Sequence, residues 1–437
     1  MSGMRFISTR GGPAVGLETA IMAGTAPDGG LYVPVELPQL EAGQCPVDAP
    51  LADVARFVLR PFFAGSSLAQ DFDEICDAAF NFSAPVRVVA EGPERLAVLE
   101  LFHGPTAAFK DFGARFLAAT MARIVAQRAG EQEPATIVVA TSGDTGGAVA
   151  AAFHRQPGMR VVVLFPEGRV SPRQQHQLTC WGDNVIALAV RGEFDDCQRV
   201  AKELFADAEN SARHNLCSAN SINVGRLLPQ AVYYAKTSAD AMAARGEASR
   251  FVIPTGNLGN AFACAWAASL GFPVEELVLA TNANRTIPDY LADGVWQPRS
   301  SIATLASAMD VGDPSNMERL RHLWGDAELL QGRIRAYSVS DAQIREQILT
   351  EYRSQGSAWC PHTATGFHVY RHSLSAAERR AGTWTIAATA HAAKFDTIVE
   401  PLIGQSVAAP PELTRLLDWP AQYETIEARA DEVLARL

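Results

Sequence analysis

The sequence predicts an α/β fold in which parallel sheets are flanked by helices. Short apolar runs rich in β-branched residues alternate with helical stretches through most of the 437 residues. Strands that are apolar throughout are typical of parallel sheets covered on both faces. Ligands of such sheets bind beyond the carboxyl ends of the strands, so we expect the functional loops there. The predicted strands are 136–140, 160–165, 184–188, 250–253, 276–280 and 384–387.

The length of the chain predicts more than one domain. Residues 1–95 are expected to form an N-terminal lobe, with a helix at 16–22, a short strand at 31–33 and helices between 48 and 82. Apolar residues spaced about 3.6 apart indicate those helices. We expect a large domain of residues 96–125 and 221–437, and a small α/β domain of residues 126–220 between its two parts.

Composition narrows the class of function and the location. A net charge of −11 disfavours nucleic acid and acidic membranes as partners. No apolar run reaches the ~18 residues of a membrane span, and no signal-like apolar stretch opens the chain. The seven cysteines contain no CxxC pair, which is typical of reduced thiols. We therefore expect a cytoplasmic protein.

One loop places a lysine at the start of a helix. The segment 103–112 ends in Phe109-Lys110-Asp111-Phe112, and an apolar helical face follows until Gly130. A helix N-terminus and an apolar setting both favour the neutral amine that Schiff-base chemistry requires. The alternative is a lysine whose stem packs on the phenylalanines while its head stays in water.

Two glycine-rich loops, each between a strand and a helix, predict anion sites. They are Thr141-Ser142-Gly143-Asp144-Thr145-Gly146 and Pro254-Thr255-Gly256-Asn257-Leu258-Gly259-Asn260. Free backbone N–H groups at a helix N-terminus bind phosphate or carboxylate. The first loop lacks the spacing of a dinucleotide fingerprint and of a P-loop. A plain tight turn is the alternative for either loop.

The lysine and the two loops together predict a pyridoxal 5'-phosphate site. That cofactor needs a lysine, a phosphate cup and a place for the substrate carboxylate. No metal site is expected, because His103, His362 and His391 lie far apart in sequence without ligand spacing. We expect these histidines to be structural.

The segment His103-Gly104-Pro105-Thr106, followed by Phe109-Lys110-Asp111, resembles the cofactor-lysine motif of the threonine synthase family. Similar motifs extend over nearly the whole chain. They lie at 8–11, 26–34, 141–146, 220–234, 254–260, 280–282, 314–319, 361–364 and 390–395. Two positions depart from the family pattern: Leu258 stands where phenylalanine is usual, and Ala392 where proline is usual.

The resemblance implies the tryptophan-synthase-β-like fold, fold type II of pyridoxal-phosphate enzymes, and the conversion of O-phospho-L-homoserine and water into L-threonine and phosphate. It implies that Lys110 carries the cofactor as a Schiff base and that Thr389 bonds the pyridine nitrogen. The implied phosphate cup is Gly256, Asn257, Leu258, Gly259 and Asn260, and the implied substrate-carboxylate loop is Ser142, Gly143, Asp144 and Thr145.

The departing phosphate needs cationic or multi-donor support. Ser221, Arg226 and Lys394 are the candidates for this support. Asn223, expected beside Arg226 on one helix face, is also predicted to bind the substrate. Two other functions stay open. One is a related pyridoxal-phosphate lyase that releases 2-oxobutyrate, which only the product distinguishes. The other is a catalytically silent binding protein, which a colourless preparation would indicate.

Overall fold

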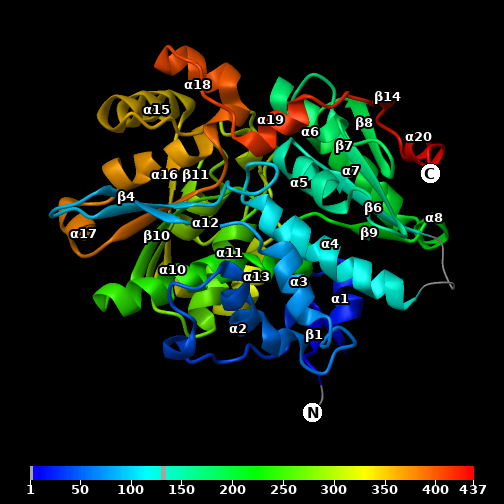
Figure 1. Cartoon of the computed structure of the whole chain (residues 1–437), viewed down its shortest axis with the longest axis horizontal. Coiled ribbons are helices and arrows are strands. Elements are labelled where there is room, and N and C mark those ends of the chain that lie inside the picture. Colours follow the sequence, from blue (N-terminus) through cyan, green and yellow to red (C-terminus); the bar gives the residue numbers. More distant parts are fainter. Residues whose placement is uncertain (1–2, 129–133) are drawn as a thin grey trace.

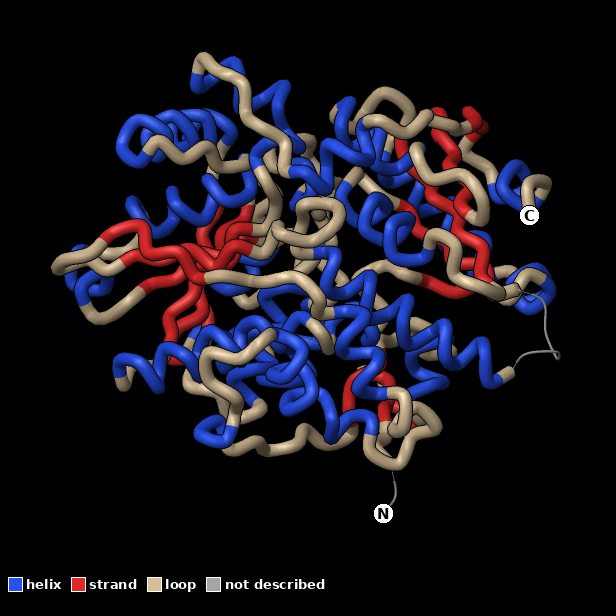
Figure 2. The backbone as a smooth tube through the Cα atoms, in the orientation of Figure 1, coloured by secondary structure: helices blue, strands red, loops and turns tan. Residues whose placement is uncertain are grey.

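The computed structural model describes residues 3–128 and 134–437. Figures 1 and 2 show two separate groups of strands, each surrounded by helices, with the N-terminal helices packed below them. The arrangement confirms an α/β fold with helices on both faces of its parallel sheets. Within the described residues, no helix is both long enough and apolar enough to span a membrane.

The larger sheet has six strands in the order β12-β11-β10-β13-β5-β4. Only β4 runs antiparallel to its neighbour, so the other five strands direct their carboxyl ends to one edge. Both faces are buried: Phe251 and Ile253 belong to one apolar cluster, and Val252 between them belongs to another. This explains why these strands are apolar throughout. The strands are β4 Val86–Ala90, β5 Leu96–Glu100, β10 Ser249–Pro254, β11 Val274–Thr281, β12 Ile334–Ser338 and β13 Trp384–Ala388.

Helices from several parts of the chain cover this sheet. One face carries α10 and α11, and the other carries α15 and α16. The helices of this region are α9 Val224–Leu227, α10 Gln230–Arg245, α11 Gly259–Ser269, α12 Thr286–Asp293, α13 Met317–Trp324, α14 Ala327–Gln331, α15 Asp341–Gln355, α16 Pro361–His372, α17 Ala376–Arg380 and α18 Asp396–Ile403, with 3-10 turns η2 Ser307–Met309 and η3 Ala392–Phe395.

The smaller sheet has five parallel strands in the order β14-β8-β7-β6-β9. Its strands are β6 Ala135–Ala140, β7 Met159–Pro166, β8 Val185–Arg191, β9 Leu216–Ser218 and β14 Glu424–Glu427. Its helices are α5 Asp144–Phe153, α6 Pro172–Thr179, α7 Phe194–Ala206, α8 Ala208–Arg213, α19 Pro411–Leu417 and α20 Ala430–Leu434. All six predicted strands are therefore present, with ends shifted by at most three residues.

The C-terminal segment corrects the predicted domain boundary. Strand β14 pairs with β8, and Ile426 is buried in the same apolar cluster as Leu188 and Val190. The chain therefore returns to the small domain, as the position of the C-terminus in Figure 1 shows. We expected residues 221–437 to stay in the large domain. A four-residue strand, Glu-Thr-Ile-Glu, carries too little apolar signal to reveal the return.

The N-terminal lobe contains a small antiparallel sheet with the order β2-β1-β3. Its elements are β1 Phe6–Ser8, β2 Gly11–Val15, α1 Leu17–Ala23, β3 Tyr32–Pro34, η1 Ala42–Gln44, α2 Leu51–Phe63 and α3 Phe72–Ala79. The predicted limit at residue 95 is wrong for β4, which forms the edge of the large sheet. Val86 and Val88 of this edge strand are exposed, so the strand has no fully buried face to predict it by.

Helix α4, Lys110–Gln127, links the three regions. It packs against α1 and α3 of the N-terminal lobe, α5 of the small domain and α9 of the large one. Eleven of its residues are buried, which explains its near-continuous small and apolar sequence. Its predicted start is confirmed, whereas Gly130, the predicted stop, lies outside the described residues.

Candidate active site

Main-chain hydrogen bonds hold Lys110 beside the end of β13. The Phe109 N–H donates to the Thr389 carbonyl at 2.8 Å, and the His391 N–H donates to the Ala107 carbonyl at 3.0 Å. These bonds fasten the loop after β5 to the loop after β13. Lys110 and Thr389, far apart in sequence, thus meet at the carboxyl edge of the large sheet. The Thr389 hydroxyl donates no hydrogen bond to the residues described.

A buried carboxylate shapes the turn before Lys110. Asp111 accepts hydrogen bonds from the Thr106 N–H at 2.8 Å and the Thr106 hydroxyl at 2.6 Å. Between them the backbone of Ala107 takes a φ of +54°, a conformation that the fixed ends of the turn impose. The turn therefore sets where the Lys110 side chain begins.

The surroundings of Lys110 favour its neutral form. Burial, helped by the charges of Lys394 and Arg226, lowers the pKa of its ammonium group to about 8 against the opposing effect of Asp144. This agrees with the sequence-based expectation of an amine that loses its proton easily. The aliphatic stem also runs beside Phe109, whose ring centre lies 5.8 Å from Nζ.

The loop between β10 and α11 forms a cup of free donors. The N–H groups of residues 256–261 donate no hydrogen bond to any other described residue. Leu258 has a φ of +63°, which turns these groups to one side as α11 begins. The Asn260 Nδ2 group is buried and unpartnered, while its Oδ1 accepts from Tyr233 and Tyr234. Unsatisfied buried donors at a helix start fit a phosphate group.

Several side chains around the cup bond to its backbone and to one another, which keeps it in place. Asn257 donates to the Ser221 hydroxyl at 2.7 Å and accepts from the Ser315 N–H at 2.7 Å. Arg319, fully buried, donates to the carbonyls of Tyr32 and Ile222. It also donates to Asn316 Oδ1, and Asn316 in turn donates to the Asn257 carbonyl. The motif at 314–319 resembled the family pattern, but the sequence did not suggest this supporting role.

Gly256→Ala tests the cup. A Cβ atom at Gly256 would lie 2.6 Å from the Cα of Met309, so either the cup or η2 must move. We expect the dissociation constant of pyridoxal phosphate to rise about ten-fold or more, since misaligned donors lose charge-assisted hydrogen bonds. Absorbance titration of the cofactor-free protein measures this. Gly43→Ala, where a Cβ atom meets open space, is the matched control. Equal affinity in both variants would contradict the cup.

The loop after β6 offers a second set of donors. The Thr141 hydroxyl accepts from the N–H groups of Gly143 and Gly146, each at 2.9 Å, which curls the loop. A Cβ atom at Gly146 would meet Thr141 at 2.4 Å, so the curl requires glycine there. The N–H groups of Ser142, Asp144 and Thr145 donate to no described residue. They can bind an anion at the start of α5.

The side chain of Asp144 is committed to the protein. Its carboxylate accepts from Lys394 Nζ at 2.8 Å and from Gln174 at 3.0 Å, and both charged groups are buried. Burial alone would raise the pKa of Asp144, but Lys394 and Lys110 hold it well below its usual range. An ionised carboxylate repels a substrate carboxylate. The predicted substrate contact of Asp144 can therefore involve its N–H group and not its side chain.

Among the predicted phosphate-binding residues, Arg226 has the clearest free donor. Its side chain is buried and pairs with no carboxylate among the described residues. Nη1 donates to the Ala219 carbonyl at 2.5 Å, whereas Nε is buried without a partner. Nε packs against α4 at Gly113, about one turn after Lys110. A Cβ atom added at Gly113 would lie 2.9 Å from Nε.

Asn223 is a helix cap in the structure. Its Oδ1 accepts from the Gly225 N–H at 2.9 Å, and its Nδ2 donates to the carbonyls of Ile21 and Ser218. Both Nδ2 hydrogens and one lone pair of Oδ1 are therefore used within the protein. Asn223 positions α9, which carries Arg226, and its amide has no N–H left to donate to an anionic substrate.

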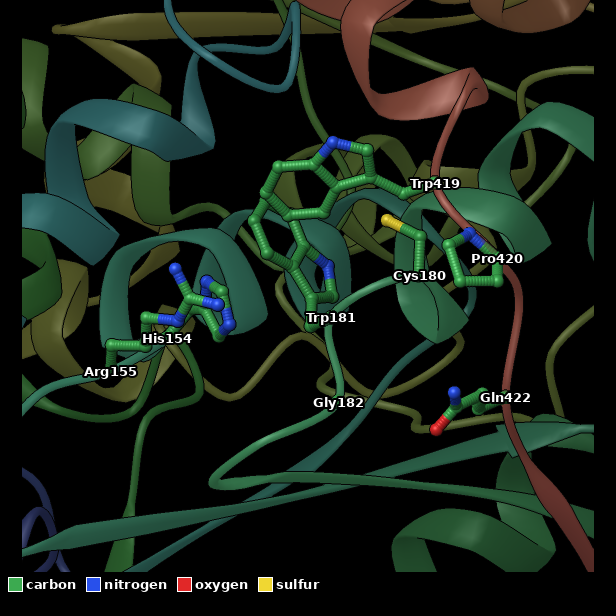
Figure 3. Close-up of a pocket in the computed structure, with 8 residues that line it drawn as sticks. All are labelled: His154, Arg155, Cys180, Trp181, Gly182, Trp419, Pro420 and Gln422. Carbon is green, nitrogen blue, oxygen red and sulfur yellow. The ribbon is translucent and has the colours of Figure 1, made fainter.

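A separate pocket, drawn in Figure 3, contains none of the predicted site residues. Trp181 of the small domain and Trp419 of the C-terminal segment pack against each other there, with ring centres 5.6 Å apart. His154 packs on Trp181 at 5.2 Å. The Gln422 N–H donates to the Thr179 carbonyl close by. This pocket marks where the C-terminal segment docks, not where the chemistry takes place.

The fold and the match of residues 89–389 to the family described as "Pyridoxal-phosphate dependent enzyme" together define a pyridoxal-phosphate-dependent enzyme. Lys110 and the loop with unpaired N–H groups at 256–261 lie at the carboxyl edge of the large sheet, and the loop of residues 141–146 follows β6 of the small one. Residues 5–80 match "Threonine synthase N terminus", and residues 363–436 match "Threonine synthase, C-terminal". The chain belongs to the threonine synthase family, with pyridoxal 5'-phosphate as its cofactor and the activity of a lyase.

Relatives from several bacteria support this membership. Threonine synthase of Escherichia coli (strain K12) is 37% identical over 95% of this chain and 94% of its own length. That of Pseudomonas aeruginosa is 37% identical over 95% and 94%. The crystal structure of the E. coli protein has a TM-score of 0.88, 33% identity and 99% coverage of both chains. The pyridoxal-phosphate-bound structure from Brucella melitensis has a TM-score of 0.89, 36% identity and coverage of 99% and 98%.

Proposed function

We propose that this chain converts O-phospho-L-homoserine and water into L-threonine and phosphate, with Lys110 as the residue that binds the cofactor covalently. The observation that supports it most directly is the position of Lys110. A lysine with a lowered pKa lies between two loops of unpaired N–H groups, one suited to the cofactor phosphate and one to a substrate carboxylate. In this proposal the cup is residues 256–260, and Thr389 offers its hydroxyl to the pyridine nitrogen.

Each residue of the site has a distinct task in this reaction. The bound cofactor withdraws electrons from the substrate carbon next to the amine, which makes its proton acidic. Lys110 is the base that removes this proton, since a pKa of about 8 lets its amine lose its own proton readily near neutral pH. The N–H groups of Ser142, Asp144 and Thr145 hold the carboxylate end. The cup and Thr389 keep the reacting carbon within reach of Lys110.

The leaving phosphate requires positive charge, and the site supplies it despite the overall charge of −11. Arg226 offers a buried Nε–H without a partner. Lys394 donates to Asp144 and to the Thr106 carbonyl, each at 2.8 Å, which leaves the third of its three N–H groups for a ligand. The Ser221 hydroxyl completes the set. These groups stabilise the phosphate as it departs and exclude bulk water from it.

A product assay tests the proposal. Purified protein, pyridoxal phosphate and O-phospho-L-homoserine are incubated, and threonine, 2-oxobutyrate and phosphate are quantified together. Threonine and phosphate in equal amounts are expected. Phosphate with 2-oxobutyrate would instead assign the chain to the lyase alternative. A colourless protein that forms no product from any phosphorylated amino acid would favour the silent alternative.

Arg226→Met tests the phosphate contact. The substitution keeps an unbranched buried chain but removes the charge, so we expect kcat/KM for O-phospho-L-homoserine to fall about 10- to 100-fold, the value of a hydrogen bond to a charged group. Steady-state kinetics measures the change. Arg155→Met, at an exposed arginine paired with Asp183, should leave kcat/KM unchanged. If Arg226→Met retains the full kcat/KM, Arg226 does not bind the substrate phosphate.

We also infer a cytoplasmic location for the chain. Its seven cysteines are all free and buried in the structure. Unpaired cysteines in this number are typical of proteins kept in a reducing compartment. Cell fractionation tests the inference: an antibody to the protein should detect it in the cytoplasmic fraction and not among exported proteins.

A further inference from the structure

His362 has one ring nitrogen in use and one without a partner. Nε2 accepts a hydrogen bond from the Ala308 N–H at 3.0 Å, whereas Nδ1 is buried and bonds to nothing. The ring is 3% exposed. A neutral imidazole that accepts at Nε2 carries its proton on Nδ1. His362 therefore presents a buried N–H donor without an acceptor, which proteins rarely leave unsatisfied.

The fold directs this donor toward the active site. Gly366, one turn further along α16, already lies beside Pro254, the last residue of β10, and beside Ile386 of β13. Helix α16 runs opposite to these strands, so its first turn projects past their carboxyl ends. Lys110 and Thr389 lie at that same edge.

Two neighbours place the His362 ring among the cationic groups of the site. Its ring centre lies 4.9 Å from that of Phe395, which directly follows Lys394. On the other side, η2 holds Nε2 through Ala308, and the next residue, Met309, packs on Gly256 of the cup. The ring is thus fixed between the cup and Lys394. This is at odds with the expectation that His362 is a satisfied structural histidine.

Electrostatics agree with a donor that stays neutral. Burial, helped by the charges of Lys110 and Lys394, lowers the pKa of His362 to about 4 against the opposing effect of Asp144. A neutral N–H beside two lysines suits an anion, since it adds a donor without adding a third buried charge.

We propose that His362 is a ligand-contacting residue of this active site, whose Nδ1–H donates a hydrogen bond to an anionic oxygen bound beside Lys110 and Lys394. The oxygen belongs either to the cofactor ring or to the phosphate of the substrate, and both present the same acceptor chemistry. The proposal rests on the proposed function, because that function brings both anions to this edge of the sheet.

Two amide variants separate the two ring nitrogens. His362→Gln places an amide near Nε2 and can keep the contact with Ala308, but it has no donor at Nδ1. His362→Asn places a donor near Nδ1. His154→Leu is the control, because His154 is a half-buried histidine whose ring bonds to Asp183, and it lies in the remote pocket of Figure 3.

The first readout is the visible spectrum and cofactor dissociation constant of the cofactor-loaded protein without substrate. The second is the affinity of that protein for inorganic phosphate, together with KM and kcat for O-phospho-L-homoserine. We expect His362→Gln to weaken one of these affinities about ten-fold and His362→Asn to restore most of it. A shifted spectrum identifies the cofactor oxygen. An unchanged spectrum with weaker phosphate binding identifies the substrate.

Unchanged spectrum, cofactor affinity and phosphate affinity in His362→Gln would overturn the proposal, as would an equal loss in His154→Leu. The spectral readout needs no turnover, so a failure of the threonine synthase reaction stays distinguishable from a failure of this contact. Should His362→Gln not fold, the ring ¹⁵N signals of histidine in the wild-type protein decide the matter. The ¹⁵N chemical shift of Nδ1 in His362 is expected to change when cofactor or phosphate is added. An unchanged chemical shift would contradict the contact.

Discussion

Lys110→Ala is expected to retain no covalently bound cofactor and to lose at least about 10³-fold in kcat. The alanine removes both the amine that binds the cofactor and the base that moves the substrate proton, and general base catalysis alone contributes about 10²- to 10⁴-fold. The experiment is a comparison of absorbance after gel filtration with steady-state turnover.

The chain offers unusually clean controls for this variant. It contains only four lysines: Lys110, Lys202, Lys236 and Lys394. Borohydride reduction followed by peptide mapping should find the cofactor on Lys110 alone, and Lys202→Ala and Lys236→Ala should keep both colour and turnover. Cofactor attached to any other lysine, or near-normal turnover by Lys110→Ala, would contradict the assignment.

The lowered pKa of Lys110 adds a pH dependence to the same experiment. Only the neutral amine reacts with the cofactor aldehyde. Cofactor capture by the cofactor-free protein should therefore accelerate as the pH rises through the pKa of about 8 and level off roughly one pH unit above it, where nearly all Lys110 has lost its proton. With an ordinary lysine, whose pKa is about 10.4, the rate of cofactor capture would keep rising up to about that pH. Stopped-flow absorbance from pH 6 to 10 distinguishes the two profiles.

The sequence revealed the parts of the fold whose signal is local. Strands such as β7 and β10 are buried on both faces, so each residue is apolar and the run is visible by itself. Strand β14 contributes one buried residue, Ile426, and its pairing partner β8 lies more than 200 positions earlier. Its place depends on long-range pairing, which no local pattern encodes.

The same distinction applies to the active site. Lys110 and the two anion loops could be predicted because each depends on a short segment with its own chemistry. The ion pair of Asp144 with Lys394 could not be predicted, since it depends on how the small domain packs against η3. The unpartnered Nδ1 of His362 could not be predicted either, because Ala308, which occupies Nε2, comes from a separate loop. Residue type indicated what each group can do, and tertiary packing determined which of its atoms stay free.

The buried pair of Asp144 and Lys394 gives the largest expected effect on stability. The two side chains are 4% and 0% exposed and joined at 2.8 Å, across the boundary between α5 of the small domain and η3 of the large one. Removing one partner leaves the other charge buried without compensation. We expect Asp144→Asn or Lys394→Met alone to lower the free energy of unfolding by about 3–5 kcal/mol.

The double variant that combines Asp144→Asn with Lys394→Met is expected to lose less free energy of unfolding than the two single variants lose together. Neither charge is then left unpaired. Denaturant unfolding of all four proteins measures this coupling. The pair Lys236 and Asp240 is a matched control, since it joins the same two residue types at 2.7 Å on a helix surface. Its coupling should stay below about 1 kcal/mol. Additive losses at Asp144 and Lys394 would show that the pair does not act as a unit.

Acid should weaken the Asp144 pair in a direction that the pKa shift fixes. The pKa of Asp144 is lower in the folded state than in the unfolded chain, where it is about 3.9. The folded state therefore binds the proton less readily, and the pair contributes its full stability above about pH 4. This contribution is lost as the pH falls toward the folded-state pKa. In Asp144→Asn the part of the acid-induced loss that comes from this carboxylate should be absent, so the difference between wild type and variant should shrink steadily below pH 4. A constant difference would place the stabilising charge elsewhere.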